Sequence, residues 1–579
     1  MDRQPSVLSS SAVMAVGTVF SRASGLLRGL LLAAALGTQL HADGFNIANT
    51  IPNMLYILLA GGVFNAVLVP QLVRSMKFDE DGGEAYTNRI ITLAGVFLAG
   101  VTAVLVIAAP LIMRLYLDPS YFHGGLDGQR DSVIAFARLC LPQVFFYGMF
   151  VLVGQVLNAR GKFGPMMWAP IANNAISVVV LVIYLVSFGA ARNLCDHAGL
   201  PTLAALNGPN STLGGFSAGQ EWVLGLGSTL GIAVQFLILI PYLRAAGFTF
   251  RPRFDFRGTG LGHTMRLGTW TVLFVVVNQI AYTVVVRLAS KGTAHAVSAV
   301  CSTAHADPGT GYTIYSGAFL LIMVPHGIAT VSLATATLPR LSAAAAAGDL
   351  RRLGRDVSST LRTTLALILP FAALLPVVAL PLTNLVYGYG ASKNTASDYA
   401  LSLALFAPGL LFFTTHYLVL RGFYALERTR TVFWVQCVIA AVNIVVAIVV
   451  TSNTSPQHTA PGLVVAYGTS YLVGAVCSYG LLRRIVGGLD TAVLIRFLVR
   501  MVIAVAVATL AAWGSRELIE HFWAPGDGKL QALVTLGVPG VVDVAIFVVL
   551  ARALQITEVT EVTALLGSRL PRRLRGSRR

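Results

Sequence analysis

Long apolar stretches separated by short polar segments dominate this chain. A helix needs about 20 apolar residues to cross the hydrocarbon core of a bilayer, and windows of that length predict fourteen membrane-spanning helices. The second and eighth have the weakest pattern, because they contain many polar residues and prolines. We expect the spans at about residues 7–36, 45–72, 88–115, 131–158, 164–188, 221–245, 263–289, 311–338, 357–386, 397–424, 430–452, 460–485, 494–515 and 530–554.

The composition supports an all-α polytopic membrane protein. Of the 579 residues, 56% are hydrophobic and only 11% are charged, whereas an average soluble protein is roughly 25% charged. So few charges cannot cover a water-facing surface, which excludes a soluble enzyme, a disordered protein and a collagen-like fibre. The N-terminal apolar run continues to Leu36 with arginines inside it, so we interpret it as a retained span and not as a cleaved signal peptide.

The net charge of +17 is explained by the distribution of Lys and Arg between loops. If the N-terminus is cytoplasmic, basic residues gather in the loops on the same side and in the C-terminal tail. This is the positive-inside pattern, and it predicts that both ends lie in the cytoplasm. The tail is expected to contact anionic lipid. No nucleic-acid motif accompanies the charge, so no nucleic-acid partner is expected.

The chain also repeats itself. Four markers in the first half recur in the same order in the second half, at offsets between 266 and 271 residues: Pro70 and Pro339, Pro110 and Pro381, Pro142 and Pro408, and Trp168 and Trp434. Two parallel six-helix lobes are typical of transporters with a substrate path between repeats. We predict an N-lobe at 1–257, a C-lobe at 258–490, helices 13 and 14 at 491–556, and a basic tail at 557–579.

Two arginines lie inside the first span. Arg22 and Arg28 are six residues apart, which places them about 9 Å apart along a helix and about 120° apart around it. An arginine at the centre of a span costs about 2.5–3.5 kcal/mol on insertion scales, so it is rarely kept without a function. Guanidinium groups match phosphate oxygens, which favours an anion site. Snorkelling to the interface or pairing with an acid are the alternatives.

Further polar residues occur in spans 2 and 7. Asn49 and Asn53 flank Pro52, a pattern that indicates an irregular, cavity-lining helix. Asp43 lies at the outer entry of span 2, where it either pairs with an arginine across the cavity mouth or caps a helix. Arg287 lies near the outer end of span 7 and forms either a second basic wall of the cavity or an interfacial anchor.

Asp543 is the one acid that the pattern places deep within a span. It could pair with an arginine, hydrogen-bond across helices or carry a coupling proton. Of the five cysteines, three fall within spans, whereas Cys195 and Cys301 fall in external loops. An exterior compartment permits disulfides, so these two are candidates for a bond that would join the two halves.

No motif for covalent chemistry is present. The GLGSTLG sequence at 225–231 lies in an apolar helix and is typical of helix packing, not of a nucleotide loop. The histidines lack metal-ligand spacing. We therefore expect no enzymatic activity and no cofactor, with the membrane potential or a coupling cation, Na⁺ or H⁺, as the energy source.

Several motifs resemble the MurJ/MviN family of lipid II flippases. They are SRASGLLR at 21–28, ADGF at 42–45, IPN and GGVFNAVLVPQL in span 2, and LNARGKFGPMMWAPIANN at 157–174. The resemblance implies a 14-helix V-shaped transporter, related to MATE exporters, that flips lipid-linked peptidoglycan precursor across the bacterial cytoplasmic membrane. It implies lipid II, membrane lipids and cell-wall synthesis proteins as partners, and helices 13 and 14 at 491–556, which are apolar nearly all round, are then expected to form a groove for the lipid tail. Arg22, Arg28 and Asp43 match family positions associated with substrate handling.

The sequence departs from the family pattern in two spans. Many members have adjacent arginines in span 2 where Tyr56 and Ile57 stand here, and many carry an Asp-Arg pair in span 8 where this chain reads GAFLLIMVP. Arg287 is a candidate replacement. The alternatives are a flippase for another lipid-linked oligosaccharide and a MATE-like antiporter. A scaffold for a cell-wall complex is a further alternative, but scaffolding gives no reason to keep arginines inside a span.

Overall fold

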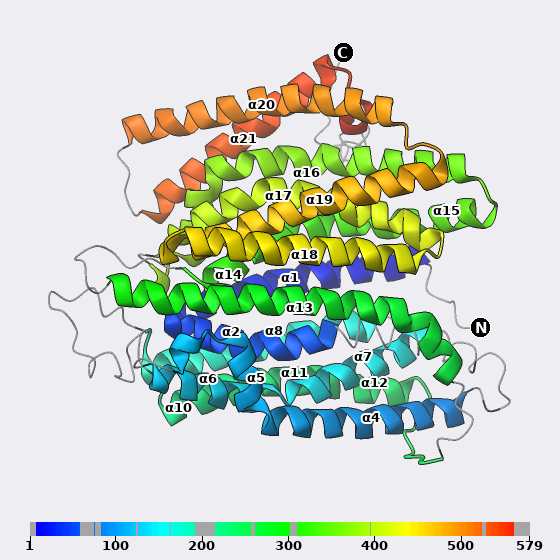
Figure 1. The fold of residues 1–579 in the computed structure, drawn as a ribbon, viewed down its shortest axis with the longest axis vertical. Helices are drawn as coiled ribbons and strands as arrows, with labels where there is room; N and C mark the ends of the chain where they lie inside the picture. The colour runs from blue at the N-terminus through cyan, green and yellow to red at the C-terminus, as the bar shows by residue number, and fades with distance from the viewer. Residues whose placement is uncertain are drawn as a thin grey trace. The chain divides into compact units, whose positions relative to one another are not determined.

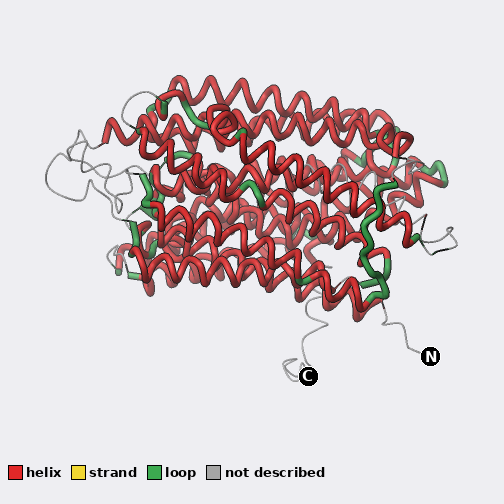
Figure 2. Tube along the Cα trace, turned by 90° about the horizontal axis from the view of Figure 1, so that it is seen from below, coloured by secondary structure: helices red, strands yellow, loops and turns green. Residues whose placement is uncertain are grey.

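The structure, a computed structural model, describes residues 7–57, 75, 81, 83–122, 126–162, 164–191, 215–255, 261–300, 310–393, 395–523 and 528–560. These residues fold into helices joined by short loops, and this described part of the chain contains no strand (Figure 2). The all-α fold follows from the apolar composition, because a helix satisfies all of its backbone hydrogen bonds within one segment in lipid.

The described helices agree with the predicted spans, and residues 58–72 of the second predicted span lie outside the described residues. In the described first half of the chain they are α1 (Val7–Leu36), α2 (Leu40–Ile57), α4 (Glu84–Ile107), α5 (Ala109–Tyr116), α6 (Asp127–Cys140), α7 (Gln143–Ala159), α8 (Gly164–Phe188), α10 (Ala218–Glu221), η4 (Trp222–Leu226), α11 (Gly227–Leu237), α12 (Leu239–Ala245) and α13 (Leu261–Val300), with the short η2 (Pro119–Tyr121) after α5 (Figure 1).

The described second half continues with α14 (Tyr312–Pro325), η5 (His326–Val331), α15 (Ser332–Ala346), α16 (Leu350–Tyr387), η6 (Gly390–Ser392), α17 (Asp398–Ala425), α18 (Thr429–Asn453), η7 (Pro456–His458), α19 (Thr459–Val486), α20 (Thr491–Phe522) and α21 (Lys529–Ala553). Twelve helical segments of the described residues are long and apolar enough to cross a membrane. The first two predicted spans fall on α1 and α2, whose described parts are not among those twelve. The chain is thus a multi-pass membrane protein.

Breaks within the predicted spans have local causes. The fourth span is divided into α6 and α7 at Pro142, which lacks the N–H that would continue the ladder of hydrogen bonds. The third span is divided at Ala108, and Pro110 stands in the first turn of α5, where a missing N–H costs nothing. The sixth and eighth spans each contain a π-helical turn, η4 and η5.

The chain forms two compact units. Unit 1 comprises residues 1–314, 387–395 and 451–460, and unit 2 comprises residues 315–386, 396–450 and 461–579. The long α13 therefore belongs to unit 1, together with the helices that precede it in the chain.

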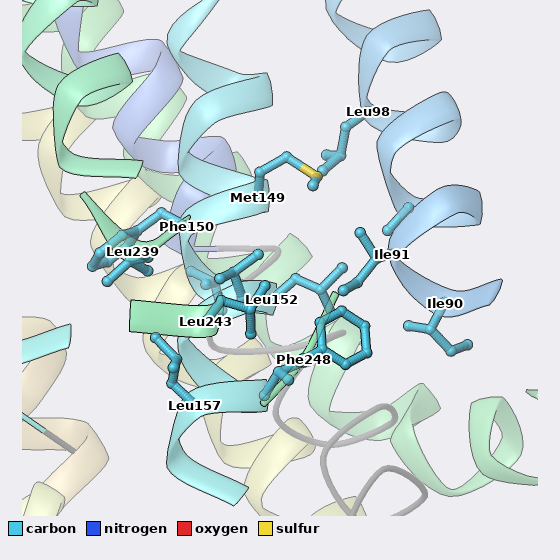
Figure 3. Close-up of a cluster of buried hydrophobic side chains, with 14 of the residues drawn as sticks. Ile90, Ile91, Leu98, Met149, Phe150, Leu152, Leu157, Leu239, Leu243 and Phe248 are labelled. Atoms are coloured by element: carbon cyan, nitrogen blue, oxygen red, sulfur yellow. The ribbon is translucent and has the colours of Figure 1, made fainter. Parts of the chain in front are cut away.

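Unit 1 contains a core that joins α4, α7 and α12 (Figure 3). Leu98 of α4 is fully buried and lies against Gly148 of α7, where a Cβ would come within 2.4 Å of its methyl carbon. Phe248 follows α12 and packs into the same cluster. In unit 2 a second cluster joins α20 and α21 to α16 through residues such as Phe497, Met501 and Phe547.

Candidate functional site

One face of α13 carries polar side chains at intervals of three or four residues. This spacing places them on a single stripe of the helix, and every member makes a hydrogen bond within unit 1. Gln279 donates through Nε2 to the carbonyl oxygen of Met54 in α2 at 2.7 Å. The stripe consists of Gln279, Thr283, Arg287, Ser290 and Thr293. It fastens α13 to α2 and α5.

Arg287 and Ser290 hold the C-terminal end of α5. The Nη1 of Arg287 donates to the carbonyl oxygens of Leu115 at 3.2 Å and of Arg114 at 3.5 Å. The hydroxyl of Ser290 accepts a hydrogen bond from the backbone N–H of Asp118 at 3.0 Å. The last carbonyl groups of a helix lack partners within the helix and carry partial negative charge. The observed contacts of Arg287 are therefore those of a cationic cap on α5.

Asp43 lies in the first turn of α2 and is fully buried. Its carboxylate accepts hydrogen bonds from the backbone N–H groups of Tyr312 at 2.9 Å and Thr313 at 2.7 Å, and from the hydroxyl of Thr293. Tyr312 and Thr313 are the first two residues of α14. The carboxylate thus caps the N-terminus of α14, where unpaired N–H groups and the helix dipole favour an anion. It does not cap its own helix.

Gly311 makes this cap possible. Its φ of +98° lies in the left-handed region that favours glycine. A Cβ at this position would lie 1.7 Å from the Thr293 hydroxyl oxygen and 2.3 Å from the Asp43 carboxylate. The turn that precedes α14 therefore has no room for a side chain between the two partners.

The N-terminal part of α2 makes further polar contacts with α14. Asn46 donates through Nδ2 to the Thr313 hydroxyl at 2.9 Å, and the hydroxyl groups of Thr50 and Tyr312 lie 2.7 Å apart. Together with Asp43, these residues occupy one face of α2 at intervals of three and four. α2 and the start of α14 thus form a continuous polar contact inside unit 1.

The adjoining face of α2 meets α7. Gln143 is buried and donates through Nε2 to the Asn49 side-chain oxygen at 3.0 Å. Two turns further along α2, the ring of Tyr56 lies 4.7 Å from that of Tyr147. Tyr56 is one of the two residues that stand where family members carry arginines, so an aromatic contact occupies that position here. Asn53 lies between these contacts in sequence, and its side chain is exposed.

The two arginines of α1 differ in environment. Arg22 is exposed, whereas Arg28 is half-buried and within electrostatic range of Tyr147 on α7. Arg28 lies two turns after Ser21, so it shares the face on which Asn174 of α8 donates to the Ser21 carbonyl oxygen and to the Ser24 hydroxyl. In the described residues neither arginine forms an ion pair. Both guanidinium groups are therefore free of a carboxylate in this part of the chain.

Asp543 is buried in α21, where its Oδ1 accepts a hydrogen bond from the Thr509 hydroxyl of α20 at 3.4 Å. No cation within the described ranges forms an ion pair with it. Cys195 and Cys301 lie outside the described residues, and the three other cysteines are free. The part of the chain that the structure describes holds no group of three or more His, Cys, Asp or Glu side chains that could bind a metal.

A family model described as "Lipid II flippase MurJ" matches residues 32–533. The chain belongs to this family. Among curated relatives, the probable lipid II flippase MurJ of Synechocystis is 24% identical over 98% of this chain and 97% of its own length. That of Rhizobium tropici is 24% identical over 92% of both chains, and that of Haemophilus influenzae is 25% identical over 72% of this chain and 75% of its own length.

Solved structures show the same fold. A lipid II flippase MurJ in an inward closed conformation has a TM-score of 0.69 with 17% identity, covering 94% of this chain and 99% of that chain. An inward-facing multidrug resistance MATE transporter has a TM-score of 0.59 with 15% identity, covering 81% of this chain and 96% of that chain. The all-α MurJ and MATE-like fold predicted from the sequence is confirmed.

The partners of Asp43 and the polar stripe of α13 are not predictable from the motifs considered above. A signal for the stripe was present, because polar residues recur every three or four positions through an otherwise apolar span from Gln279 to Thr293. The capping of α14 had no comparable signal. Tyr312 and Thr313 contribute backbone N–H groups, which every residue except proline possesses.

Proposed function

We propose that this chain moves lipid II, the lipid-linked peptidoglycan precursor, from the inner to the outer leaflet of the bacterial cytoplasmic membrane by alternating access. The observation that carries the proposal is the family match over residues 32–533, together with a curated MurJ relative that aligns over 98% of the chain. We further propose that both ends lie in the cytoplasm, and that cell-wall synthesis proteins are partners.

The chemistry of α1 supports this substrate class. Lipid II carries a diphosphate, which cannot cross hydrocarbon unassisted, and a polyprenyl tail, which is stable there. Arg28 is half-buried in a membrane helix without a carboxylate partner among the described residues. A guanidinium group in that setting matches phosphate oxygens by charge and by its forked donors. We propose that Arg28 contacts the diphosphate, with Arg22 on the route by which it enters or leaves.

Transport of this kind breaks no covalent bond. An inside-negative membrane potential favours outward movement of an anion by about 2.3 kcal/mol per charge per 100 mV. A coupling cation, Na⁺ or H⁺, is the alternative source of energy. In the proposed cycle, the contacts of Asp43 with α13 and α14 are made in one access state and broken in the other, because a short set of hydrogen bonds can be exchanged reversibly.

The decisive experiment is depletion of the chain in living cells followed by leaflet-specific detection of lipid II. Accumulation confined to the inner leaflet, reversed by the wild-type chain but not by Arg28→Ala, is the expected result. Arg138→Ala is a matched control, because Arg138 is an exposed arginine of another span. Unchanged lipid II exposure, with normal growth of Arg22→Ala and Arg28→Ala cells, would refute the proposal. Accumulation of a different polyprenyl-diphosphate glycan would reassign the substrate.

Ionophores that collapse the potential, the proton gradient or the sodium gradient separately identify the energy source.

A further inference from the structure

Two connections in the second half of the chain belong to unit 1. Residues 387–395 join α16 to α17, and residues 451–460 join α18 to α19. The remainder of these four helices belongs to unit 2, so each connection lies in a different compact unit from the helices that it joins. By the predicted orientation, with both ends in the cytoplasm, the two connections lie on the external side. We call these two segments the outer straps.

The first outer strap packs against the end of α1. The hydroxyl of Thr38, which follows α1, donates to the hydroxyl of Thr395 at 2.9 Å, and both side chains are buried. The backbones come closest at Gly390, whose φ is +54°. A Cβ at Gly390 would lie 2.2 Å from the carbonyl oxygen of Ala34. This strap therefore lies directly on the backbone of α1, with no room for a side chain between them.

The second outer strap packs against α13 through η7 and the start of α19. A Cβ at Gly292 of α13 would lie 2.4 Å from the hydroxyl oxygen of Thr459, which is buried. The backbone N–H of Ala460 donates to the hydroxyl of Thr310 at 3.4 Å. Gly292 directly precedes Thr293, the residue that donates to Asp43. The second strap therefore lies beside the position at which α13 holds this buried carboxylate.

The chemistry of both contacts suits a joint that opens and closes. Every residue that makes the contacts named above is glycine, alanine or threonine, so the contacts bury no charge and no large apolar side chain. Small residues allow two backbones to approach closely, and their separation exposes little apolar surface, each Å² of which costs about 25 cal/mol. The core of unit 1 packs instead through large side chains such as Leu98 and Phe248, whose separation would cost far more.

We propose that the two outer straps close the external side of the transporter, and that they lift from α1 and α13 together when that side opens. The inference rests on the proposed function. Each strap is continuous with helices of unit 2, so a movement of those helices relative to unit 1 pulls on both straps. Opening then breaks the hydrogen bond between Thr38 and Thr395 and separates Thr459 from Gly292.

The first test joins one strap to α1 by a disulfide. Thr38→Cys combined with Thr395→Cys places two sulfur atoms where two hydroxyl oxygens lie 2.9 Å apart. In cells that depend on this variant, oxidation should stop the appearance of lipid II in the outer leaflet, and a reductant should restore it. The wild-type chain and each single variant, oxidised in the same way, are the controls. A fully cross-linked chain that still exposes lipid II at the wild-type rate would overturn the proposal.

The second test does not depend on lipid II. It uses the single variant Thr38→Cys in spheroplasts, with a membrane-impermeant maleimide added outside. Labelling should be slow while the strap covers this buried position. Gly292→Ala collides with Thr459 on the second strap, and because the straps lift together it should accelerate labelling severalfold. Gly514→Ala is the matched control, since a Cβ at this helical glycine would meet nothing within 4 Å.

The two tests separate this proposal from the flippase proposal. If depletion of the chain left lipid II exposure unchanged, the flippase proposal would fail, and the labelling rates would still decide whether the straps move. Equal labelling in the Gly292→Ala and Gly514→Ala backgrounds would show that the straps do not move together and would overturn the inference. If Gly292→Ala fails to fold, the reversible cross-link decides alone, because the reduced double-cysteine variant is its own control for folding.

Discussion

The carboxylate of Asp43 accepts a hydrogen bond from the backbone N–H of Thr313 at 2.7 Å, across 270 positions of the chain. The same carboxylate accepts from Thr293 on α13. One buried acid therefore joins α2, α13 and the first two residues of α14, which lie far apart in sequence. Because the two backbone donors belong to the first turn of α14, a negative charge at this position is favoured by the helix dipole as well as by the hydrogen bonds.

We predict that Asp43→Asn destabilises the chain by about 1–3 kcal/mol, since an amide loses the charge and directs donors at N–H groups that need an acceptor. Thr293→Val removes one donor and leaves both backbone contacts, so its effect should be smaller, at about 1–2 kcal/mol. Denaturant unfolding in micelles measures both. If the two variants were equally stable, the charge at the N-terminus of α14 would not be what holds this contact.

Gly311→Ala should be far more damaging than an ordinary glycine substitution. Gly348 is the matched control. Its φ of +70° also lies in the left-handed region, but a Cβ there would meet nothing within 4 Å. Gly348→Ala should therefore cost only the backbone strain, about 1 kcal/mol. At Gly311 the added carbon would also collide with Thr293 and Asp43. We expect poor yield of folded protein for Gly311→Ala and normal yield for Gly348→Ala, measured by size-exclusion chromatography of fluorescently tagged chains.

A third prediction concerns the segment between α12 and α13. Arg89 of α4 forms an ion pair with Asp255, and Asn88 accepts a hydrogen bond from the backbone N–H of Arg251 at 2.8 Å. The hydrogen bond from Arg89 holds the pKa of the Asp255 carboxyl below its usual value. Because the pKa is lowered in the folded state, the contribution of this ion pair is present above the unfolded-state pKa of about 4 and is lost as the pH falls through the folded-state value.

Hydrogen–deuterium exchange at residues 248–255 should therefore become faster at acidic pH, after correction for the intrinsic exchange rate. Arg89→Gln should make exchange faster already at neutral pH and should remove most of this pH dependence, because without the guanidinium group the folded-state pKa of Asp255 is no longer held below its unfolded-state value by that partner. A profile that is identical in the wild-type chain and in Arg89→Gln would show that the segment is held by its backbone contacts alone.

The sequence was sufficient for the helices and insufficient for their contacts. Spans 7–36 and 164–188 match α1 and α8 residue for residue, because membrane helices are set by the length of an apolar run, a local property. The partner of a buried polar residue is not local. Asp43 could be identified as an unusual acid, but its donors on α14 are backbone groups with no sequence signature.

The roles of the three arginines also depend on contacts that are not local in sequence. Placing Arg22, Arg28 or Arg287 inside an apolar span costs free energy, so each of them is recognisable from the sequence, but their roles are not. In the structure, the groups that surround each guanidinium group distinguish these roles. Arg287 donates hydrogen bonds to helix-end carbonyl groups. Arg28 forms no ion pair within the described ranges and lies within electrostatic range of Tyr147.

Asp543 is expected to be a structural residue. Its hydrogen bond with Thr509 joins α20 to α21, the two helices that also share apolar side chains such as Met501 and Phe547 in one cluster of unit 2. Asp543→Asn can keep this bond through the amide oxygen, so stability should change by less than about 1 kcal/mol and transport should persist. A residue that carried a coupling proton would lose transport in the same variant, because an amide cannot titrate. Lipid II exposure in cells complemented with Asp543→Asn separates the two roles, and Asp543→Leu controls for loss of the hydrogen bond.

The last prediction compares Arg287 with Arg28, which carry the same charge on different helices. Arg287→Gln removes a cationic cap from the end of α5, an interaction worth about 1 kcal/mol, and a glutamine amide can still donate to the same carbonyl oxygens. We therefore expect a modest loss of stability and near-normal lipid II exposure. Arg28→Gln removes a guanidinium group that has no carboxylate partner in the described residues, so stability should change little while lipid II accumulates in the inner leaflet. Measuring both the thermal unfolding temperature and the leaflet distribution of lipid II for each variant distinguishes a stabilising role from a role in substrate binding. If Arg287→Gln abolished transport without lowering the unfolding temperature, Arg287 would be a substrate-contacting residue after all, and the cap on α5 would be secondary to that role.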